Sequence, residues 1–293
     1  MSAPTRPAPK PGHARNEWAA ERHVYEPHLV GLPPVGQYLR EVWRRREFAV
    51  ELSRTRLRAQ HHNTVFGQLW LVLNPLLLAG VYFILIDIIR RGDHPPGFFG
   101  HLVAGIFAYY FVRGAIGDSV KSVTSGSRLI LNSAFPRMLL PLSTVVTAFK
   151  RFIPCVVVYI PVHLLSGLPI GPHLLWIVPL VGLMTILAAG FATIVSALQV
   201  YFRDLKSFLP FVLRLGLYIS PVLYLASEVP DKYKLLLDIN PIGQLLAAWS
   251  DVLYAGQAPS VHELAFACAW SFGAFIVGAL FFMSREREFA VRL

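Results

Sequence analysis

The chain has 293 residues, of which 55% are hydrophobic and 15% charged, and its mean hydropathy is +0.51. A soluble domain of ordinary composition is less apolar and more charged, so this composition indicates an integral membrane protein and excludes disordered, collagen-like and disulfide-scaffold classes. At roughly 20 residues for each membrane helix, the length accommodates about six crossings and leaves no room for a separate soluble enzyme domain. The formal net charge is +10, and eleven of the 27 Lys and Arg residues precede residue 60.

Residues 1–34 contain seven prolines and few apolar residues, which predicts a flexible cytosolic tail. In the next region, 35–68, apolar residues recur at helical spacing while arginines fill the opposite face. We expect an amphipathic helix that lies in the headgroup plane of the membrane; the alternative is a solvated helix packed on a partner. Nucleic-acid binding explains this charge less well, because a basic stretch before a membrane span already has a reason. The arginines of interest are Arg44, Arg45, Arg46, Arg56 and Arg58.

Six apolar segments follow that are long enough to cross a membrane. The first contains Asn74 and Pro75, which predict a kink because proline removes a helical hydrogen bond. The third is expected to begin after Lys150 and Arg151, which would lie at the membrane interface and leave residues 121–149 on one side. The predicted spans are 69–89, 99–120, 152–168, 174–199, 208–226 and 262–283.

The distribution of positive charge predicts the orientation. With the N-terminus inside, 21 Lys and Arg residues fall on the inner side and four on the outer side, which favours both termini in the cytosol. The long outer connection, 227–261, holds apolar pieces too short to span. We expect two short re-entrant or interfacial helices there, broken at Asn240 and Pro241, with a plain amphipathic loop as the alternative.

Two arginines within the predicted spans, Arg113 and Arg214, are candidates for contact with an anionic group, because charges at membrane depth face a protein interior or a wet cavity. The alternative is that each reaches the interface or pairs with an acid such as Asp118. The sequence contains no nucleotide-binding loop, zinc-site motif or nucleophile elbow, so we predict no catalytic centre, metal site or bound cofactor in this chain. Cys155 and Cys268 are expected to be small buried hydrophobic residues.

Aromatic residues make up 13% of the chain and occur in local clusters. Sugar rings stack on aromatic faces, so such residues near an outer exit are candidates for a saccharide track; the alternative is the aromatic belt found at membrane interfaces. The candidates are Phe107, Tyr109, Tyr110, Tyr218, Tyr224 and Trp249.

Several short motifs resemble, in order, those of the ABC-2 type permeases that export lipid-linked polysaccharides such as O-antigen and teichoic acid. These are the residues Arg56, Arg58, Gly67, Leu69, Trp70, Asn74 and Pro75; Phe135-Pro136-Arg137 with Pro141-Leu142; Tyr201-Phe202-Arg203-Asp204-Leu205; Tyr218-Ile219-Ser220-Pro221; and Asn240-Pro241. The departures are Gln60-His61-His62-Asn63 and Trp249-Ser250-Asp251. The Arg-rich, Lys-poor composition indicates a GC-rich genome, and the chain as a whole resembles actinobacterial cell-wall galactan exporters.

The resemblance implies an all-α polytopic fold with the transmembrane domain at 69–293. It also implies a homodimer that works with two copies of a separate ATPase subunit, which bind the ATP and Mg²⁺. The substrate would be a polyprenyl-diphosphate-linked glycan in the cytoplasmic (inner) membrane, whose diphosphate the five arginines named above would attract. Alternatives are an ABC-2 permease for drugs or simple lipids, an intramembrane enzyme acting on polyprenyl lipids, and an ion channel or secondary transporter.

Coupling to the ATPase is expected in the cytosolic stretch 122–137, as a short helix that Pro136 helps to end. Arg128 and Arg137 would pair with acids on the ATPase, and Asn132 and Phe135 lie in the same stretch. Arg203 and Asp204 form a second candidate contact, for which a local ion pair is the alternative.

Overall fold

The computed structural model of the chain describes residues 34–60 and 67–292, and within them every regular element is a helix. The predicted tail, apart from Pro34, lies outside the described residues, as do 61–66 of the predicted amphipathic region and residue 293. The α-helices are α1 (Val35–Arg44), α2 (Arg46–Gln60), α3 (Trp70–Arg90), α4 (Phe98–Ser119), α5 (Ser122–Ser125), α6 (Ser127–Asn132), α7 (Leu139–Leu165), α8 (Ile177–Tyr201), α9 (Leu205–Ile219), α10 (Asp231–Ile239), α11 (Gly243–Ser250), α12 (Val261–Arg285) and α13 (Phe289–Arg292). Short 3-10 segments occupy Gly67–Leu69, Pro172–Trp176, Ala226–Glu228 and Glu286–Glu288, and a π-helical turn occupies Asp251–Ala255.

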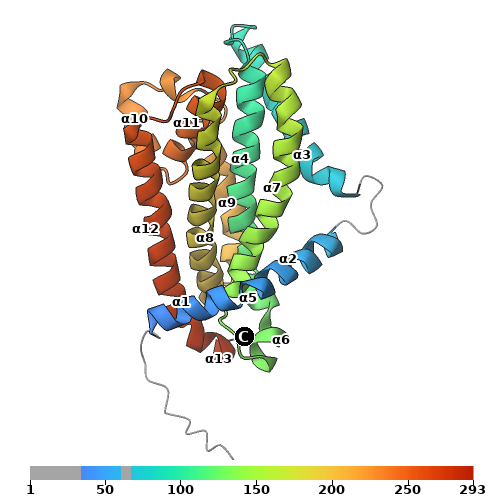
Figure 1. Cartoon of the computed structure of the whole chain (residues 1–293), viewed down its shortest axis with the longest axis vertical. Coiled ribbons are helices and arrows are strands. Elements are labelled where there is room, and N and C mark those ends of the chain that lie inside the picture. Colours follow the sequence, from blue (N-terminus) through green and yellow to red (C-terminus); the bar gives the residue numbers. More distant parts are fainter. Residues whose placement is uncertain (1–33, 61–66, 293) are drawn as a thin grey trace, which may run out of the picture. The chain divides into compact units, whose positions relative to one another are not determined.

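Five helical segments of the described chain are long and apolar enough to cross a membrane. They are α3, α4, α7, α8 with the 3-10 segment before it, and α12 with the short turns after it. These helices run alongside one another, with α4 the most deeply buried (Figure 1). The prediction of an all-helical membrane protein is confirmed, and five of the six predicted apolar segments correspond to these helices.

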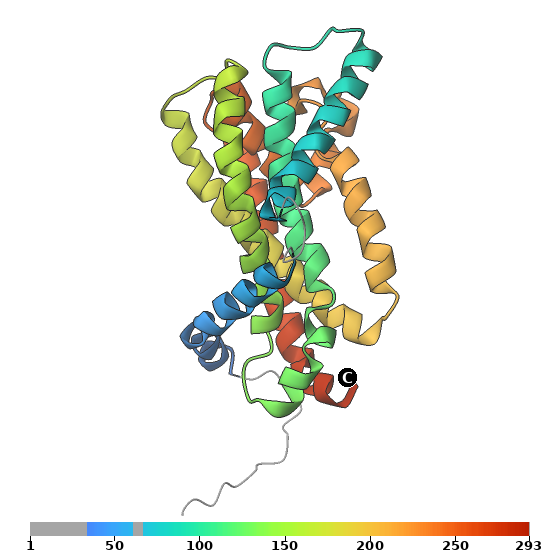
Figure 2. The same ribbon diagram turned by 90° about the vertical axis from the view of Figure 1, so that its right-hand side faces the viewer.

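The remaining predicted span, 208–226, overlaps α9, a helix of only 15 residues. At 1.5 Å per residue it is about 22 Å long, whereas a bilayer core is about 30 Å thick. After Ile219 the chain leaves the helix with Ser220 in an extended conformation. The helix alone is therefore too short for a span, and the sixth crossing stays a prediction. Figure 2 shows α9 at the edge of the bundle.

Helix α7 begins at Leu139, 13 residues before the predicted start of the third span, so the helix is longer than the predicted span, and the point at which it enters the membrane stays a prediction. The physical reason is that both charges expected to mark the boundary find partners on neighbouring helices. The Lys150 ammonium donates to the carbonyl of Val50 on α2 at 3.3 Å, and the Arg151 guanidinium donates to the Asp118 carboxylate on α4 at 2.7 Å. The helix therefore continues through both residues.

The expected amphipathic helix is two helices, α1 and α2, which meet at Arg45. They run across the lower part of the bundle in Figure 1, at a steep angle to the long helices. Val42 and Ala49 are buried in a cluster with Leu139 and Leu140 at the start of α7, whereas Trp43 is 70% exposed. One face of the pair thus packs on the bundle; its place in the headgroup plane stays a prediction.

The 227–261 connection forms two short helices, α10 and α11, separated at Asn240 and Pro241 as predicted. Asn240 holds the break, because its Oδ1 accepts from the Ile242 backbone N–H at 3.1 Å and its Nδ2 donates to Ser220 Oγ at 2.9 Å. Every residue of α11 is buried, and the helix packs against α4, α8 and α12. The alternative of a plain loop is wrong; how deeply these helices enter the membrane stays a prediction.

Helices α8 and α12 make the closest helix contact of the described chain through glycine. A Cβ added at Gly190 would lie 2.4 Å from the backbone carbon of Ala274, and one added at Gly278 would lie 2.3 Å from the Gly190 carbonyl oxygen. Helices within lipid associate through such small residues, because burial of apolar side chains gives no driving force there. These two glycines therefore fix the contact between α8 and α12.

Candidate functional site

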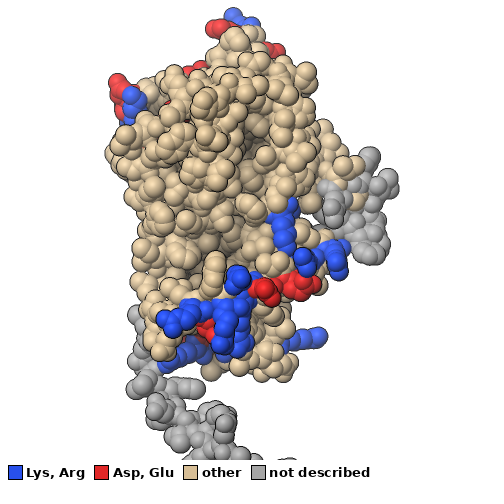
Figure 3. Space-filling view, in the orientation of Figure 1, with Lys and Arg blue, Asp and Glu red and all other residues tan. Residues whose placement is uncertain are grey.

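Basic side chains gather at one end of the bundle, which we call the basic end: the end that carries α1, α2, α5, α6 and α13. Figure 3 shows Lys and Arg concentrated along its lower part, below a broad belt of uncharged surface. The opposite end, which carries α10 and Arg90, has smaller charged groups of both signs. The arrangement agrees with the charge asymmetry found in the sequence.

The structure does not bring the five predicted lipid-binding arginines into one cluster. Arg44 and Arg45 both contact Glu41, at 2.7 and 2.5 Å. The hydrogen bond from Arg44 is the main reason that the pKa of Glu41 lies below its usual value. Arg45 also donates to the carbonyl of Ala134 at 2.8 Å, so it ties α1 to the loop before α7. Arg46 lies over the Trp43 ring, 5.0 Å from its centroid.

On α2, Arg58 is exposed, whereas Arg56 is half-buried and donates to Ser143 Oγ on α7 at 2.9 Å. Burial is the main reason that the pKa of the Arg56 guanidinium lies below its usual value; the Asp118 carboxylate raises this pKa and the Arg151 guanidinium lowers it. A guanidinium that is partly removed from water is stabilised by an anion close to it. Arg56 is thus the arginine of the predicted set that turns toward the interior.

Arg56 lines a cavity of about 410 Å³ between α2, α4, α5 and α7, which we call the basic pocket. Its lining holds three basic residues, one acid and several hydroxyls: Arg56, Gly117, Asp118, Lys121, Ser122, Ser125, Thr144, Thr147 and Arg151. A second cavity of about 390 Å³ adjoins it at Lys121 and Ser125, and its lining includes Arg203, Lys206 and Arg292 but no acidic residue.

The basic pocket contains residues whose role the sequence analysis missed. Lys121 and Arg151 are predicted there only as markers of membrane orientation, and Asp118 is named only in the alternative reading, as an acid with which Arg113 or Arg214 could pair. In the structure Asp118 instead pairs with Arg151, 33 positions away, at 2.7 Å. No local pattern signals this pair, because its members lie on different helices.

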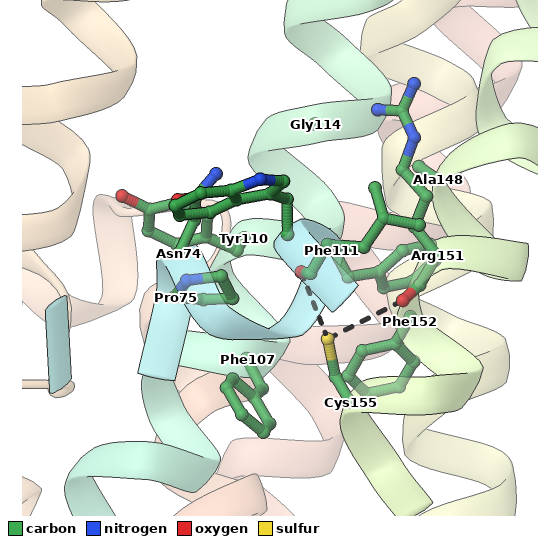
Figure 4. Close-up of a pocket in the computed structure, with 12 residues that line it drawn as sticks. Asn74, Pro75, Phe107, Tyr110, Phe111, Gly114, Ala148, Arg151, Phe152 and Cys155 are labelled. Atoms are coloured by element: carbon green, nitrogen blue, oxygen red, sulfur yellow. Dashed lines mark hydrogen bonds between the residues drawn. The ribbon is translucent and has the colours of Figure 1, made fainter. Parts of the chain in front are cut away.

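Arg151 also lines a third cavity, of about 230 Å³, between α3, α4 and α7, which we call the aromatic cavity (Figure 4). Most of its lining is aromatic or aliphatic: Trp70, Leu71, Asn74, Pro75, Phe107, Tyr110, Phe111, Gly114, Ala148, Arg151, Phe152 and Cys155. Pro75 cannot donate to the Leu71 carbonyl within α3, and the Cys155 thiol contacts that carbonyl at 3.8 Å. Cys155 is buried as expected, and Cys268 is half-buried.

Two residues of the predicted saccharide track serve packing instead. The Tyr109 hydroxyl donates to the carbonyl of Leu213 on α9, and Trp249 Nε1 donates to the carbonyl of Ala104 at 3.1 Å. Both side chains are fully or nearly fully buried, so neither offers a ring face to a sugar within this chain. Phe107 is also buried, although it lines the cavity of Figure 4 together with Tyr110.

Tyr218 is the exposed member of the predicted track. Its hydroxyl lies 3.1 Å from that of Tyr82 on α3, a residue that sequence reasoning did not select. Arg113 lies over the Tyr110 ring, 4.9 Å from its centroid. Tyr224 donates to the carbonyl of Ile219 at 2.6 Å and so closes the turn after α9.

Arg214 is exposed on α9, on a face made of large apolar side chains. The opposite face of α9 is buried through Leu209, Leu213 and Leu217. Among the described residues, Arg214 has no hydrogen-bonding or ion-pair partner.

The predicted coupling stretch forms two short helices, α5 and α6. The expectation that Pro136 helps to end the coupling helix is wrong, because α6 ends at Asn132. Pro136 instead precedes α7, where its carbonyl accepts from the Leu139 backbone N–H. Arg128 and Asn132 are exposed, as is Leu131, which is 61% exposed. α6 therefore presents a mixed polar and apolar surface at the basic end.

Phe135 and Arg137 face their own chain. The Phe135 ring packs on Phe48 of α2 with a centroid separation of 5.0 Å. The Arg137 guanidinium donates to the carbonyl of Glu286, and its backbone N–H donates to the Glu286 carboxylate at 2.6 Å. Both residues thus join the loop before α7 to other parts of the basic end.

Arg203 and Asp204 are exposed in the turn between α8 and α9. No ion pair joins the two side chains in the part of the chain that the structure describes, so the alternative of a local pair is not found. Arg203 instead lines the cavity that adjoins the basic pocket.

Comparison with known proteins places this architecture in a family. The profile described as ABC-2 type transporter matches residues 47–254. A protein of Klebsiella pneumoniae named O-antigen export system permease protein RfbA is 26% identical over 211 residues, which cover 72% of this chain and 81% of that protein. A protein of the same name from Myxococcus xanthus is 28% identical over 258 residues, 86% of this chain and 97% of that protein. The chain belongs to the ABC-2 type transporter family.

Proposed function

We propose that the chain is the membrane-spanning permease subunit of an ABC transporter that exports a polyprenyl-diphosphate-linked polysaccharide across the cytoplasmic membrane. ATP hydrolysis takes place in a separate subunit, which binds ATP and Mg²⁺. The observation that carries this proposal is the match to relatives named as O-antigen export permeases, one of them over 97% of its length. The five spans and the basic end give the architecture that such a subunit needs.

A sixth crossing through α9 is supported by contacts at its two ends. Lys206, in the first turn of α9, lines a cavity at the basic end together with Lys121 and Arg292. Glu228, nine residues after α9, binds Arg90 at the opposite end through two hydrogen bonds of 2.7 and 2.8 Å. The chain thus passes from one end to the other between them. Six crossings place both termini on the basic side, which the positive-inside rule assigns to the cytosol.

α6 is the surface through which the ATPase moves the permease. Leu129 and Leu131 are exposed beside Arg128 and Asn132, at the side assigned to the cytosol. Apolar side chains in water favour a protein partner, and the polar groups beside them fix its orientation. Arg203 and Asp204, also exposed there, give a second contact. Arg137 is held by Glu286 and acts by keeping the loop in place rather than by binding the ATPase.

Two copies of the chain form the transport path. Arg214 lies on an exposed apolar face of α9 with Phe211 and Leu215, which is unfavourable against lipid. A second protomer across this face encloses a wet channel in which Arg214 and Tyr218 meet the substrate. The five arginines predicted to recruit the lipid attract the anionic headgroup to the entrance on the inner leaflet.

The alternative substrate class, small amphiphiles such as drugs or simple lipids, gains support from one observation. Tyr109 and Trp249 are buried and committed to backbone carbonyls, which reduces the aromatic surface available to sugars. Changing Tyr110 and Tyr218 together to leucine distinguishes the two classes. Glycan export falls if these rings contact sugars, and export of a small amphiphile persists if they do not.

The test of the main proposal is affinity purification of the tagged chain in mild detergent, with mass spectrometry and an ATPase assay. We expect an ATP-binding subunit at equal stoichiometry, vanadate-sensitive hydrolysis, and intracellular accumulation of lipid-linked glycan when the chain is depleted. A chain that purifies without a nucleotide-binding partner and without hydrolysis contradicts the proposal.

A further inference from the structure

The basic pocket combines cationic groups from separate parts of the chain. Arg56 comes from α2, Lys121 from the junction of α4 and α5, and Arg151 from α7. Asp118 is the one acid in the lining, so the pocket has a formal surplus of two positive charges. A volume of about 410 Å³ is in the range of ligand-binding pockets. The charge favours an anion with more than one negative charge.

Arg56 is the member best placed to gain from such an anion. Its guanidinium is half-buried, and its hydrogen bond to Ser143 Oγ, at 2.9 Å, is to a neutral hydroxyl. Among the described residues no carboxylate forms an ion pair with it. A guanidinium offers five N–H donors, and hydrogen bonds to an ionised acceptor are about twice as strong as those to a neutral one.

Asp118 pairs with Arg151 at the wall of the basic pocket. The two side chains meet at 2.7 Å, and Asp118 remains 45% exposed, so its carboxylate can turn to solvent without losing all its contacts. An incoming phosphate would compete with this carboxylate for Arg151. The pair therefore weakens binding of any anion and favours one that Arg56 and Lys121 also hold.

The aromatic cavity adds an apolar requirement. Arg151 lies at its edge, with the guanidinium directed away from Cys155 (Figure 4). Trp70, Phe107 and Phe152 belong to its lining. An anion bound to Arg151 in the basic pocket thus has an aromatic cavity on the other side of the same residue. An amphiphile with a phosphate head and an unsaturated hydrocarbon chain satisfies both cavities.

We propose that the basic pocket binds the diphosphate of a prenyl diphosphate through Arg56, Lys121 and Arg151. The first prenyl units lie in the aromatic cavity, and the Asp118 carboxylate competes with the diphosphate for Arg151. The proposal rests on the proposed function, which supplies a lipid carrier with a diphosphate. It differs from a general attraction of lipid to basic helices, because it assigns the binding to one arginine of α2 and to two residues outside that helix.

The test compares Arg56→Gln with its matched control Arg54→Gln, which removes the same charge two residues away on the exposed side of α2. The purified protein is placed in nanodiscs of neutral phosphatidylcholine, and farnesyl diphosphate is titrated by calorimetry. We expect Arg56→Gln to weaken binding roughly tenfold or more and Arg54→Gln to change it less than about twofold. Equal effects of the two variants would overturn the site.

Asp118→Asn is expected to change the affinity for farnesyl diphosphate in the opposite direction to Arg56→Gln. It removes the competing carboxylate, so the affinity for farnesyl diphosphate rises severalfold; an unchanged affinity shows that Asp118 does not compete. Thermal unfolding of each variant is measured beside the titration. If Arg56→Gln does not fold, Arg56→Lys is used, because it keeps the charge but loses the fork of donors, and intermediate binding is then expected.

Competitors separate the possible sources of phosphate. Inorganic pyrophosphate competes weakly if the prenyl chain contributes to binding, and phosphatidylglycerol in the nanodisc leaves the titration unchanged. Competition by phosphatidylglycerol equal to that by farnesyl diphosphate overturns the proposal in favour of a general anionic-lipid surface. The outcome is separable from the proposed function. Prenyl diphosphate binding through Arg56 without an ATPase partner keeps the site and rejects the function. Normal glycan export by Arg56→Gln in a complex with the ATPase keeps the function and rejects the site.

Discussion

Tyr38 on α1 donates a hydrogen bond to the carboxylate of Glu286, 248 positions later in the chain. The same carboxylate accepts the backbone N–H of Arg137 at 2.6 Å, and the Met138 N–H approaches the Tyr38 hydroxyl at 3.4 Å. One phenol and one carboxylate thus join α1, the start of α7 and the segment after α12. Burial is the main reason that the pKa of Tyr38 lies far above its usual value of 10.0, and the negative charge of Glu286 adds to this effect.

Tyr38→Phe is expected to loosen α1 without unfolding the bundle. The change leaves the half-buried carboxylate of Glu286 without one of its donors, which typically costs about 1 kcal/mol. Hydrogen exchange followed by mass spectrometry measures this, and α1 should exchange faster while α4 stays protected. Tyr233→Phe, at an exposed site on α10, is the control and should leave the exchange of α1 unchanged. Unaltered protection of α1 in Tyr38→Phe would show that the contact contributes nothing.

Gly190→Ala is expected to disrupt packing of α8 on α12, because the added methyl group would lie 2.4 Å from the Ala274 backbone. Overpacking of this kind usually costs about 1–3 kcal/mol. The measurement is the thermal midpoint of the purified protein in detergent. Gly182→Ala is the matched control, since its methyl group would meet nothing within 4 Å on the same helix. Equal midpoints for the two variants would contradict the contact.

The Arg90–Glu228 pair is expected to make the end opposite the basic end sensitive to acid. The hydrogen bond from Arg90 is the main reason that the pKa of Glu228 lies below its usual value of 4.5. A carboxyl whose pKa is lowered by folding stabilises the folded state above its usual pKa and loses that contribution as pH falls below it. The effect is under about 1 kcal/mol, because the pair is partly exposed.

Spin labels at Ile89 and Ser227 measure this contact. The distance distribution should be narrow at pH 7 and broaden as the pH falls from about 4.5 to 3. Glu228→Gln has no carboxylate to protonate, so its distribution should not change over that range. Broadening of the same size in Glu228→Gln would assign the pH effect to another group.

Leu131→Asp is expected to weaken ATPase binding, because Leu131 is 61% exposed on α6 at the end assigned to the cytosol. Loss of an apolar contact at the centre of an interface typically costs more than about 1 kcal/mol, which is more than fivefold in affinity. Co-purification of the ATPase subunit measures the effect. Leu165→Asp, at the far end of α7, is equally apolar and more exposed, and it should leave the ATPase bound.

Arg214→Leu is expected to leave the protein at least as stable and to reduce export by more than about tenfold, since the charge is unfavourable in an apolar face unless it serves transport. Thermal unfolding and the amount of glycan at the cell surface are measured together. Arg214→Lys keeps the charge and should retain much of the export. Normal export by Arg214→Leu would remove Arg214 from the transport path.

Local pattern was sufficient for most of the fold. Apolar length predicts α3, α4, α8 and α12 within a few residues at most ends, because a membrane helix must satisfy its own backbone in lipid. The start of α7 could not be predicted, since it depends on where Lys150 and Arg151 find partners. Those partners are chosen by tertiary packing. The break at Arg45, similarly, has no proline or glycine to announce it.

Prediction of the site was less complete for the same reason. Arg56 was selected from its helix, but Lys121 and Arg151 join it only because α2 crosses α7. Among the aromatic residues, composition could not separate Tyr109, which closes a contact with α9, from Tyr218, which remains exposed. A residue type gives the chemistry available, and the packing decides whether a ligand can reach it.

The glycine contact between α8 and α12 has a consequence for how the protein is made. Gly190 and its partner Gly278 are separated by α9, α10 and α11, and α12 is the last of the five spans to be synthesised. The contact between α8 and α12 therefore cannot form when α8 enters the membrane, and the backbone of Gly190 stays uncovered until α12 has been made. A chain that ends before α12 exposes this surface.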